Sequence, residues 1–268
     1  MSGRTVTAGA RVAARAPRAR ARRARRGVVL ALVLWVLVVL GGIALGVTAA
    51  TRQGSDATTN LRARVTARYA AESGVVRAVA RLERALLEIG SDSVRRRALL
   101  NDPSRLVPDD VLPIGEGRVQ VAIVDASARV DVNAASESQL AALFARTGPA
   151  GEARSAARAI KAHIAGDGVN ARLLRSLDEL RGIDGVSEAL ASRAAPFLTV
   201  DGDGRVNRAT APREVLAAAA GELQDEPSRL VIVARGWRDG HPLTHELQVA
   251  WAVQGTQLAL VTIRERDL

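Results

Sequence analysis

The sequence predicts an α+β fold, in which a long N-terminal helix packs on an antiparallel sheet that is interrupted by a large all-helical insertion. Three observations predict this fold. An uncharged apolar run leads into a segment whose apolar residues recur with a helical period. Strand patterns, either alternation or short apolar runs bounded by turns, appear in two regions, within residues 118–132 and within residues 230–263. Between these regions, residues 134–222 carry helix-start and helix-stop signals instead.

The apolar run covers residues 28–47 and contains no charged side chain. A helix of this length is about 30 Å long, which is the thickness of the hydrocarbon core of a bilayer. We therefore expect a membrane-spanning segment. A cleaved secretory signal is the alternative, with Thr48-Ala49-Ala50 as its cut, but its apolar core would be shorter than this run. The side chains expected to anchor the segment in lipid are Leu30, Leu34, Trp35 and Leu40.

The positive charge of the chain is concentrated before this run. The net charge is +10, and residues 1–27 contribute nine arginines and no acid, which leaves +1 for the rest of the chain. Short basic flanks remain on the cytoplasmic side of a membrane. The N-terminus is therefore expected in the cytoplasm and the globular part on the other side, and the basic leader is poor support for a DNA-binding body.

The composition gives little support for an enzyme. The chain has no cysteine, which excludes disulfides and thiolate metal sites. Its three histidines, His163, His241 and His245, lie in none of the usual hydrolase or metalloprotease motifs. We expect no catalytic residue.

Beyond the apolar run, the chain from Asn60 to Ile89 predicts an amphipathic helix. A single helix over residues 28–89 would be about 90 Å long. Two helices hinged near Gly54 are the alternative. The apolar positions expected to pack on the head recur at spacings of three, four or seven: Leu61, Val65, Tyr69, Val76, Val79, Leu82, Leu86 and Ile89.

The remaining sequence divides into a head and an insertion. Residues 90–117 carry turn signals and are expected to form a loop. A strand over residues 118–124 is expected to form a hairpin with residues 129–132, and three further strands follow as an antiparallel meander. The predicted division is a leader (1–27), a helix (28–89), a head (90–133 and 223–268) and a helical insertion (134–222).

Two capping signals and a repeat mark the insertion. Ser136 is expected to cap one helix, and Ser176 with Glu179 forms a capping-box pattern at another. Residues 129–136 resemble residues 205–212 at an offset of 76. Each copy reads as a strand, a polar corner and a capped helix.

A basic leader ending in Gly27, a long N-terminal helix and a small antiparallel sheet resemble the type IV pilin and pseudopilin superfamily. More specific motifs are similar to the minor pseudopilin K of type II secretion systems. These motifs are Ala70-Ala71-Glu72-Ser73-Gly74-Val75, Ile123-Val124-Asp125-Ala126-Ser127, Val132-Asn133-Ala134-Ala135, Leu177-Asp178-Glu179-Leu180 with Gly185, and Val206-Asn207 with Ala211-Pro212.

The resemblance implies a pilin-like α+β fold and a leader that prepilin peptidase cleaves between Gly27 and Val28. It implies a single-pass protein of the inner membrane with a periplasmic head. The implied place is the tip of the pseudopilus, beside the minor pseudopilins I and J and the major pseudopilin, where it would support protein export across the outer membrane. Most pilins carry a glutamate at the fifth mature position, which is Leu32 here, and protein K members typically lack it. The second corner departs from the family's Asn-x-Asn pattern at Ala209.

Two further hypotheses concern ligands. Asp201 and Asp203 resemble the opening of a calcium loop, and calcium is known in the helical domains of relatives, although Arg205 follows where an oxygen ligand is wanted. The segment Leu180–Val186 resembles a helix-hairpin-helix turn, so a membrane-anchored DNA receptor of the competence type is the main alternative function. Ser187 replaces the second glycine of that turn, and acids surround it, so we expect no nucleic-acid partner.

Overall fold

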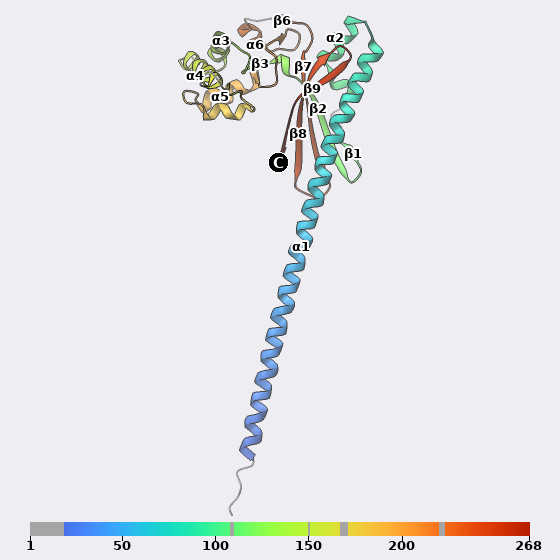
Figure 1. Cartoon of the computed structure of the whole chain (residues 1–268), viewed down its shortest axis with the longest axis vertical. Helices are drawn as coiled ribbons and strands as arrows, with labels where there is room; N and C mark the ends of the chain where they lie inside the picture. The colour runs from blue at the N-terminus through green and yellow to red at the C-terminus, as the bar shows by residue number, and fades with distance from the viewer. Residues whose placement is uncertain (1–18, 108–109, 150, 167–170, 220–222) are drawn as a thin grey trace, which may run out of the picture. The chain divides into compact units, whose positions relative to one another are not determined.

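The computed structural model describes residues 19–107, 110–149, 151–166, 171–219 and 223–268, with side chains described in these ranges except for residues 19–29 and 46–56 (Figure 1). The chain divides into two compact units, Met1–Asn60 and Leu61–Leu268. Each unit is described by itself.

Helix α1 runs from Ala19 to Ile89. The backbone stays helical through Gly41, Gly42 and Gly54, so the hinge that the sequence left open near Gly54 is not present. The helix also begins before Val28, the start that the apolar run suggested.

The second unit contains a five-stranded antiparallel sheet with the order β1-β2-β7-β8-β9. The antiparallel sheet of the predicted α+β fold is therefore confirmed. The long strands fall where alternation and short apolar runs predicted them. The strand bounds are Leu112–Ile114 (β1), Gly117–Asp125 (β2), Arg229–Arg238 (β7), Thr244–Gln254 (β8) and Gln257–Asp267 (β9).

One predicted strand was wrong. The segment expected to return as the hairpin partner of β2 contains only β3 (Val130–Asp131), which pairs in parallel with β4 (Leu198–Thr199) outside the main sheet. The reason is that a 3₁₀ turn over Ala126–Ala128 redirects the chain, with the Asp125 carboxylate accepting a hydrogen bond from the Ser127 amide. Strand β1 takes the expected fifth place in the sheet.

Residues 90–117 are not the loop that their turn signals indicated. They contain helix α2 (Ser93–Asn101), a 3₁₀ turn (Pro103–Leu106) and strand β1. Asp92 caps α2 by accepting hydrogen bonds from the amides of Val94 and Arg95. Leu100 is fully buried against Leu82 and other apolar residues, so tertiary packing stabilises a helix too short to be stable alone.

Helix α1 packs along the sheet (Figure 1). The first part of its buried face consists mainly of alanine and glycine. Gly236 of β7 lies directly beneath the helix, since an added Cβ would overlap the Ala67 carbonyl oxygen and lie 2.7 Å from the Ala71 amide nitrogen. The predicted apolar stripe was therefore wrong in its first half. Four of its members are 62–69% exposed, namely Leu61, Val65, Tyr69 and Val76. The buried positions over this stretch are Ala63, Ala67, Ala70, Ala71, Gly74, Val75 and Ala78.

The segment between β2 and β7 has its own hydrophobic core, centred on residues such as Phe144, Leu140 and Ile160, which are at most 1% exposed. The expectation of an all-helical insertion was wrong in one respect, because two short parallel strand pairs, β3–β4 and β5–β6, also lie in this region. The elements beyond β3 are α3 (Glu137–Thr147), α4 (Ala153–Ala165), η3 (Leu177–Gly182), α5 (Glu188–Ala194), η4 (Ala195–Phe197), β4, β5 (Val206–Asn207), α6 (Arg213–Ala218) and β6 (Leu223–Gln224).

The capping signals are confirmed. The Ser136 hydroxyl accepts a hydrogen bond from the Gln139 amide at the start of α3. Ser176 and Glu179 form a complete capping box at the start of the 3₁₀ helix η3. A side chain that accepts hydrogen bonds from the free amides of the first turn strongly favours a helix start at that residue. The sequence could therefore predict where α3 and η3 begin.

The 76-residue repeat is also present in the backbone. Asp131 and Asn207 each accept, through Oδ1, a hydrogen bond from the amide two residues later, at 2.9 Å and 3.1 Å. Their carbonyl oxygens accept from the amides of Ala135 and Ala211, at 2.8 Å and 3.0 Å. Each copy is a short parallel strand, a turn stabilised by an acid or amide side chain, and a helix.

Glu246 on β8 shows how the face of the sheet away from α1 is stabilised. Its carboxylate is fully buried and accepts hydrogen bonds from Arg235 (2.6 Å), Gln248 (2.8 Å) and Arg266 (2.9 Å). Burial raises the pKa of Glu246, but these hydrogen bonds outweigh burial, and the pKa lies below its ordinary value.

We expect Glu246→Gln to lower the free energy of unfolding by about 2 kcal/mol at pH 7, because the charged acceptor of three hydrogen bonds is lost. A lowered folded pKa stabilises the fold above the ordinary glutamate pKa of about 4.3, and this contribution is lost as the pH falls through the folded pKa. Urea unfolding at pH 7 and pH 3 measures both. An equal loss at the two pH values would contradict the assigned role.

Candidate functional site

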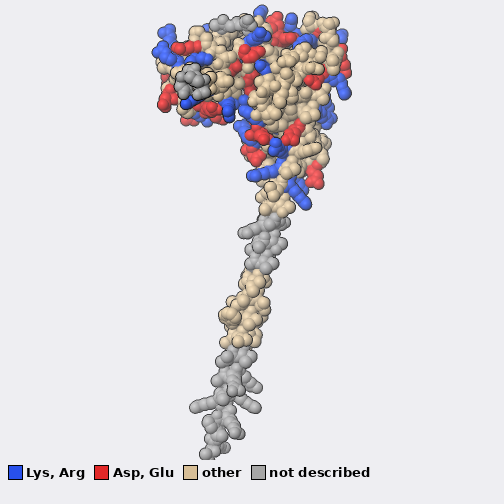
Figure 2. Space-filling model, in the orientation of Figure 1, with Lys and Arg blue, Asp and Glu red and all other residues tan. Residues whose placement is uncertain are grey.

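The described part of the apolar segment, residues 30–45, contains no charged residue (Figure 2). The four expected anchor residues Leu30, Leu34, Trp35 and Leu40 are 57–72% exposed, and Leu32, at the position of the pilin glutamate, is 61% exposed. Among the residues whose side chains are described, no helix has a stretch both long and apolar enough to cross a membrane.

The cleavage site proposed from the sequence lies at the edge of what the structure describes. Gly27 and Val28 belong to α1, and their side chains are outside the described ones. Residues 1–18 of the leader are outside the described residues altogether. The cleavage remains a prediction.

The outward face of α1 in the second unit carries exposed apolar side chains. Leu61, Val65, Tyr69 and Val76 follow one another at spacings of four, four and seven residues, so they share one side of the helix. Sequence periodicity found these residues but assigned them to the sheet. Their exposure makes this face the main candidate for contact with another protein.

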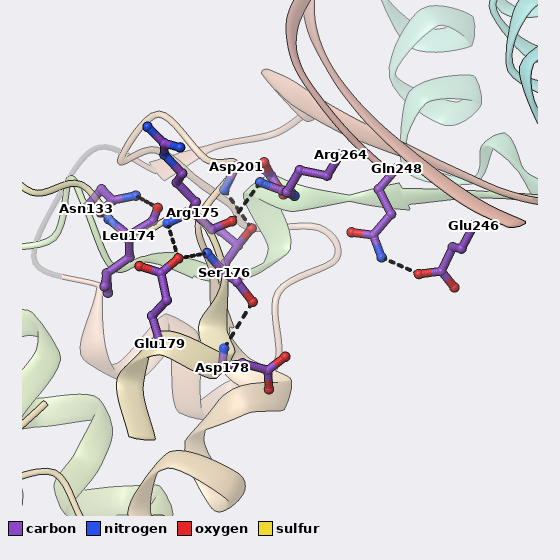
Figure 3. A network of polar contacts seen from close by, with 11 residues as sticks. Asn133, Leu174, Arg175, Ser176, Asp178, Glu179, Asp201, Glu246, Gln248 and Arg264 are labelled. Atoms are coloured by element: carbon purple, nitrogen blue, oxygen red, sulfur yellow. Dashed lines mark hydrogen bonds and ion pairs between the residues drawn. The ribbon is translucent and has the colours of Figure 1, made fainter. Parts of the chain in front are cut away.

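The carboxylates of the predicted calcium loop lie at the first corner of the repeat. Burial raises the pKa of Asp131, and repulsion from Asp201 and Asp203 raises it further. Asp201 is 8% exposed, its Oδ2 is paired with Arg264, and its Oδ1 has no hydrogen-bond partner among the described residues (Figure 3).

These carboxylates do not form a calcium cage. Within the described ranges, no three His, Asp or Glu side chains are grouped so as to hold a metal ion. Asp201 already forms an ion pair with Arg264, and Asp203 accepts a hydrogen bond from the Arg205 amide. Calcium at Asp201 and Asp203 therefore stays a prediction, and a calcium-dependent rise in melting temperature would be its direct test.

The second corner of the repeat connects the insertion to the sheet. The Asn207 amide group is fully buried and donates hydrogen bonds to Asn101 of α2 (2.8 Å) and to Asp125 at the end of β2 (2.7 Å). The Thr210 hydroxyl donates to the same Asp125 oxygen. Burial raises the pKa of Asp125 although these donors act against it. Sequence reasoning identified Asn207 through the repeat but not its partners.

Two glutamates lie beside the ends of the helix-hairpin-helix segment. The Ser187 hydroxyl caps α5 through the Leu190 amide and donates to the Glu152 carboxylate at 2.5 Å. Glu179 accepts from the amides of Arg175 and Ser176 at 3.0 Å and 2.9 Å. Negative charge at the start of α5 is unfavourable for a DNA phosphate.

The histidines show no catalytic grouping in the described chain. His245 on β8 is 7% exposed, and its Nδ1 lies 2.8 Å from Asp267 and its Nε2 3.4 Å from Glu265, both on β9. These pairs connect neighbouring strands. His163 and His241 lie elsewhere, in α4 and in the turn between β7 and β8.

Comparison with known proteins identifies a similar fold. No protein-family model matches the chain, and no curated protein matches it. The structure is similar to a chain in the crystal structure of the GspK–GspI–GspJ complex from the enterotoxigenic Escherichia coli type 2 secretion system. The TM-score is 0.54 at 13% sequence identity, and the match covers 80% of this chain and 99% of that chain.

Proposed function

We propose that this chain is a minor pseudopilin of a type II secretion system, of the protein K kind, and that it has no enzymatic activity. The observation that carries the proposal is the fold similarity to a chain of the GspK–GspI–GspJ complex, which covers 99% of that chain. Sequence motifs independently resemble protein K at several points along the chain, in the same order.

The apolar run supplies the membrane attachment in this proposal. Residues 28–47 cross the inner membrane, the arginine-rich leader stays in the cytoplasm, and the head lies in the periplasm. Prepilin peptidase removes residues 1–27. The absence of a carboxylate at Leu32 fits a subunit at the tip of the fibre, because an unpaired acid in the bilayer is costly and a tip subunit has no neighbour above it to pair with.

The outward face of α1 supplies the contact with neighbouring subunits. In a pilus-like fibre the N-terminal helices pack side by side, and the partners expected here are the I-type and J-type minor pseudopilins and the major pseudopilin. Exposed apolar side chains at helical spacing are the surface that such packing requires.

Co-purification tests this function. The full chain with a C-terminal tag is expressed from its own genome together with the I-type and J-type minor pseudopilins, solubilised in mild detergent and purified. We expect both partners to be recovered. Absence of both partners, or salt-sensitive binding of duplex DNA by the purified chain, would contradict the proposal and favour the DNA receptor.

We expect Tyr69→Glu to reduce recovery of these partners by about tenfold, since it places a charge in the apolar face of α1 without touching the core. The melting temperature of the isolated chain should change little, because the side chain is 68% exposed. Arg154→Glu on the exposed surface of α4 is the matched control and should leave recovery unchanged. If Tyr69→Glu recovered the partner pseudopilins as well as the parent chain does, the outward face of α1 would not be the surface that contacts them.

A further inference from the structure

Strand β9 is a long edge of the sheet. The sheet order leaves β1 and β9 at its two edges, and β1 has only three residues whereas β9 has eleven. An edge strand presents unpaired backbone N–H and C=O groups, which proteins ordinarily protect with charges, prolines or covering elements.

The protection of β9 is uneven. Its C-terminal part, Arg264–Asp267, consists of charged residues, and the Leu258 amide donates to the Glu83 carboxylate of α1 at 2.9 Å. Residues 259–263 between these points contain no charge and no proline, and Leu260, Val261 and Ile263 are 45–55% exposed. The middle of the edge is therefore apolar and open.

The direction of the backbone groups follows from one pair of hydrogen bonds. Thr244 and Leu268 exchange both of their backbone hydrogen bonds. Because such pairs alternate along an antiparallel ladder, Ile263, opposite Val249, is a position whose N–H and C=O point away from β8. No backbone hydrogen bond from the Ile263 amide to a group outside the sheet is present in the described chain.

A groove runs along this part of the edge. Its volume is about 880 Å³, and four consecutive residues of β9, Val261–Arg264, form one wall. Consecutive residues point to opposite faces of a sheet, so only the strand edge can present all four to one groove. The opposite wall is formed by residues 171–175 together with Asn133, Val200 and Asp201.

The charge of the groove selects its occupant. Three arginines line it, Arg172, Arg175 and Arg264, against one acid, Asp201, which is already paired with Arg264. Arg172 and Arg175 are exposed and have no ion pair among the described residues (Figure 3 shows Arg175 beside Asp201 and Arg264). Leu173, also in this wall, is 59% exposed and adds apolar surface.

We propose that this groove binds an acidic extended segment of a partner protein, which adds to β9 as a sixth strand. Backbone hydrogen bonds to positions such as Ile263 supply affinity, alternate apolar side chains contact Leu173 and the exposed side chains of β9, and carboxylates meet Arg172 and Arg175. The lining of the groove includes none of the exposed apolar residues on the outward face of α1, so variants in the groove test this proposal while leaving that face unchanged.

The probe is a fluorescent octapeptide of alternating valine and glutamate, and an octapeptide of alternating valine and lysine is the comparison. The full chain in detergent is added to each peptide, and the fluorescence anisotropy of the peptide measures binding. We expect the glutamate peptide to bind at least about tenfold more tightly than the lysine peptide. Hydrogen exchange should slow at residues 261–265 on binding. Failure of the glutamate peptide to bind, equal binding of the two peptides, or protection elsewhere would overturn the proposal.

Two variants test the mechanism separately. Ile263→Pro removes an outward N–H without removing a bond to β8 and should weaken binding about tenfold, whereas Ile263→Ala, which keeps the N–H, should bind nearly as the parent does. Arg172→Glu changes an exposed side chain and should shift the preference toward the lysine peptide. Three results would contradict strand addition by an acidic partner. The first is parent-like binding by Ile263→Pro, and the second is an unchanged peptide preference in Arg172→Glu. The third is a dimer of this chain that Ile263→Pro disrupts.

Discussion

Gly236→Ala is expected to destabilise the second unit by about 3 kcal/mol, an unusually large effect for the addition of one methyl group. The added carbon would overlap the Ala67 carbonyl oxygen of α1 and lie 2.7 Å from the Ala71 amide nitrogen. Both are backbone atoms of a helix, which cannot rotate away as a flexible side chain could. The helix must therefore move off the sheet, and the contacts of Ala70, Ala71 and Val75 are weakened with it.

Thermal unfolding of the full chain in detergent, followed by tryptophan fluorescence, measures this effect. For a unit of this size the melting temperature should fall by roughly 10 °C. Gly182→Ala is the matched control, because its added carbon would meet no atom within 4 Å, and it should change stability by at most about 0.5 kcal/mol. Similar melting temperatures for Gly236→Ala and the parent would show that α1 does not approach β7 this closely.

Asn207→Ala is expected to cost about 3 kcal/mol, because three hydrogen bonds are lost at a fully buried position. The half-buried Asp125 carboxylate would lose one donor, and Asn101 would lose a partner. The loss should appear in urea unfolding as a lower midpoint. An increase in the rate of proteolysis within the insertion would accompany it, since this corner joins the insertion to the sheet.

The equivalent position in the other copy of the repeat provides the contrast. Asp131→Asn preserves the side-chain oxygen that accepts from the Asn133 amide and removes a buried charge near two other acids. Because the folded protein raises the pKa of Asp131, it favours the protonated carboxyl group. This contribution to stability is fully present below the ordinary pKa of about 3.9 and is lost as the pH rises through the folded pKa.

Asp131→Asn should therefore gain stability relative to the parent between pH 4 and pH 7. A parent chain that is more stable than Asp131→Asn at pH 7 would show that the carboxylate has a favourable partner. If that advantage appears only with calcium, the partner is calcium.

Local signals account for what the sequence predicted well. Strands β2 and β8 follow alternation, and β7 and β9 follow apolar runs bounded by turn signals. The starts of α3 and η3 follow from side chains that cap their own amides. The repeat could be seen because the same turn, with an acid or amide accepting from the amide two residues later, needs the same residue types at both corners.

Long-range contacts account for what the sequence did not predict. β3 pairs with a strand almost seventy residues later, and nothing in the sequence near Val130 indicates that partner. Along α1, periodicity detects every apolar face without saying what each face contacts. In the first half of the stripe, the sheet packs on alanine and glycine while the larger side chains around Tyr69 stay exposed, so that half was assigned to the wrong surface. Leu82 and Leu86 in the second half are buried as predicted.

The proposal that this chain is a pseudopilin is tested most directly by the N-terminus of the protein in its native membranes. Intact-mass measurement and N-terminal sequencing of the full chain, extracted from cells that contain prepilin peptidase, locate that end. The account predicts that residues 1–27 are removed and that the mature chain begins at Val28. A chain that retains the arginine-rich leader in these membranes would contradict it.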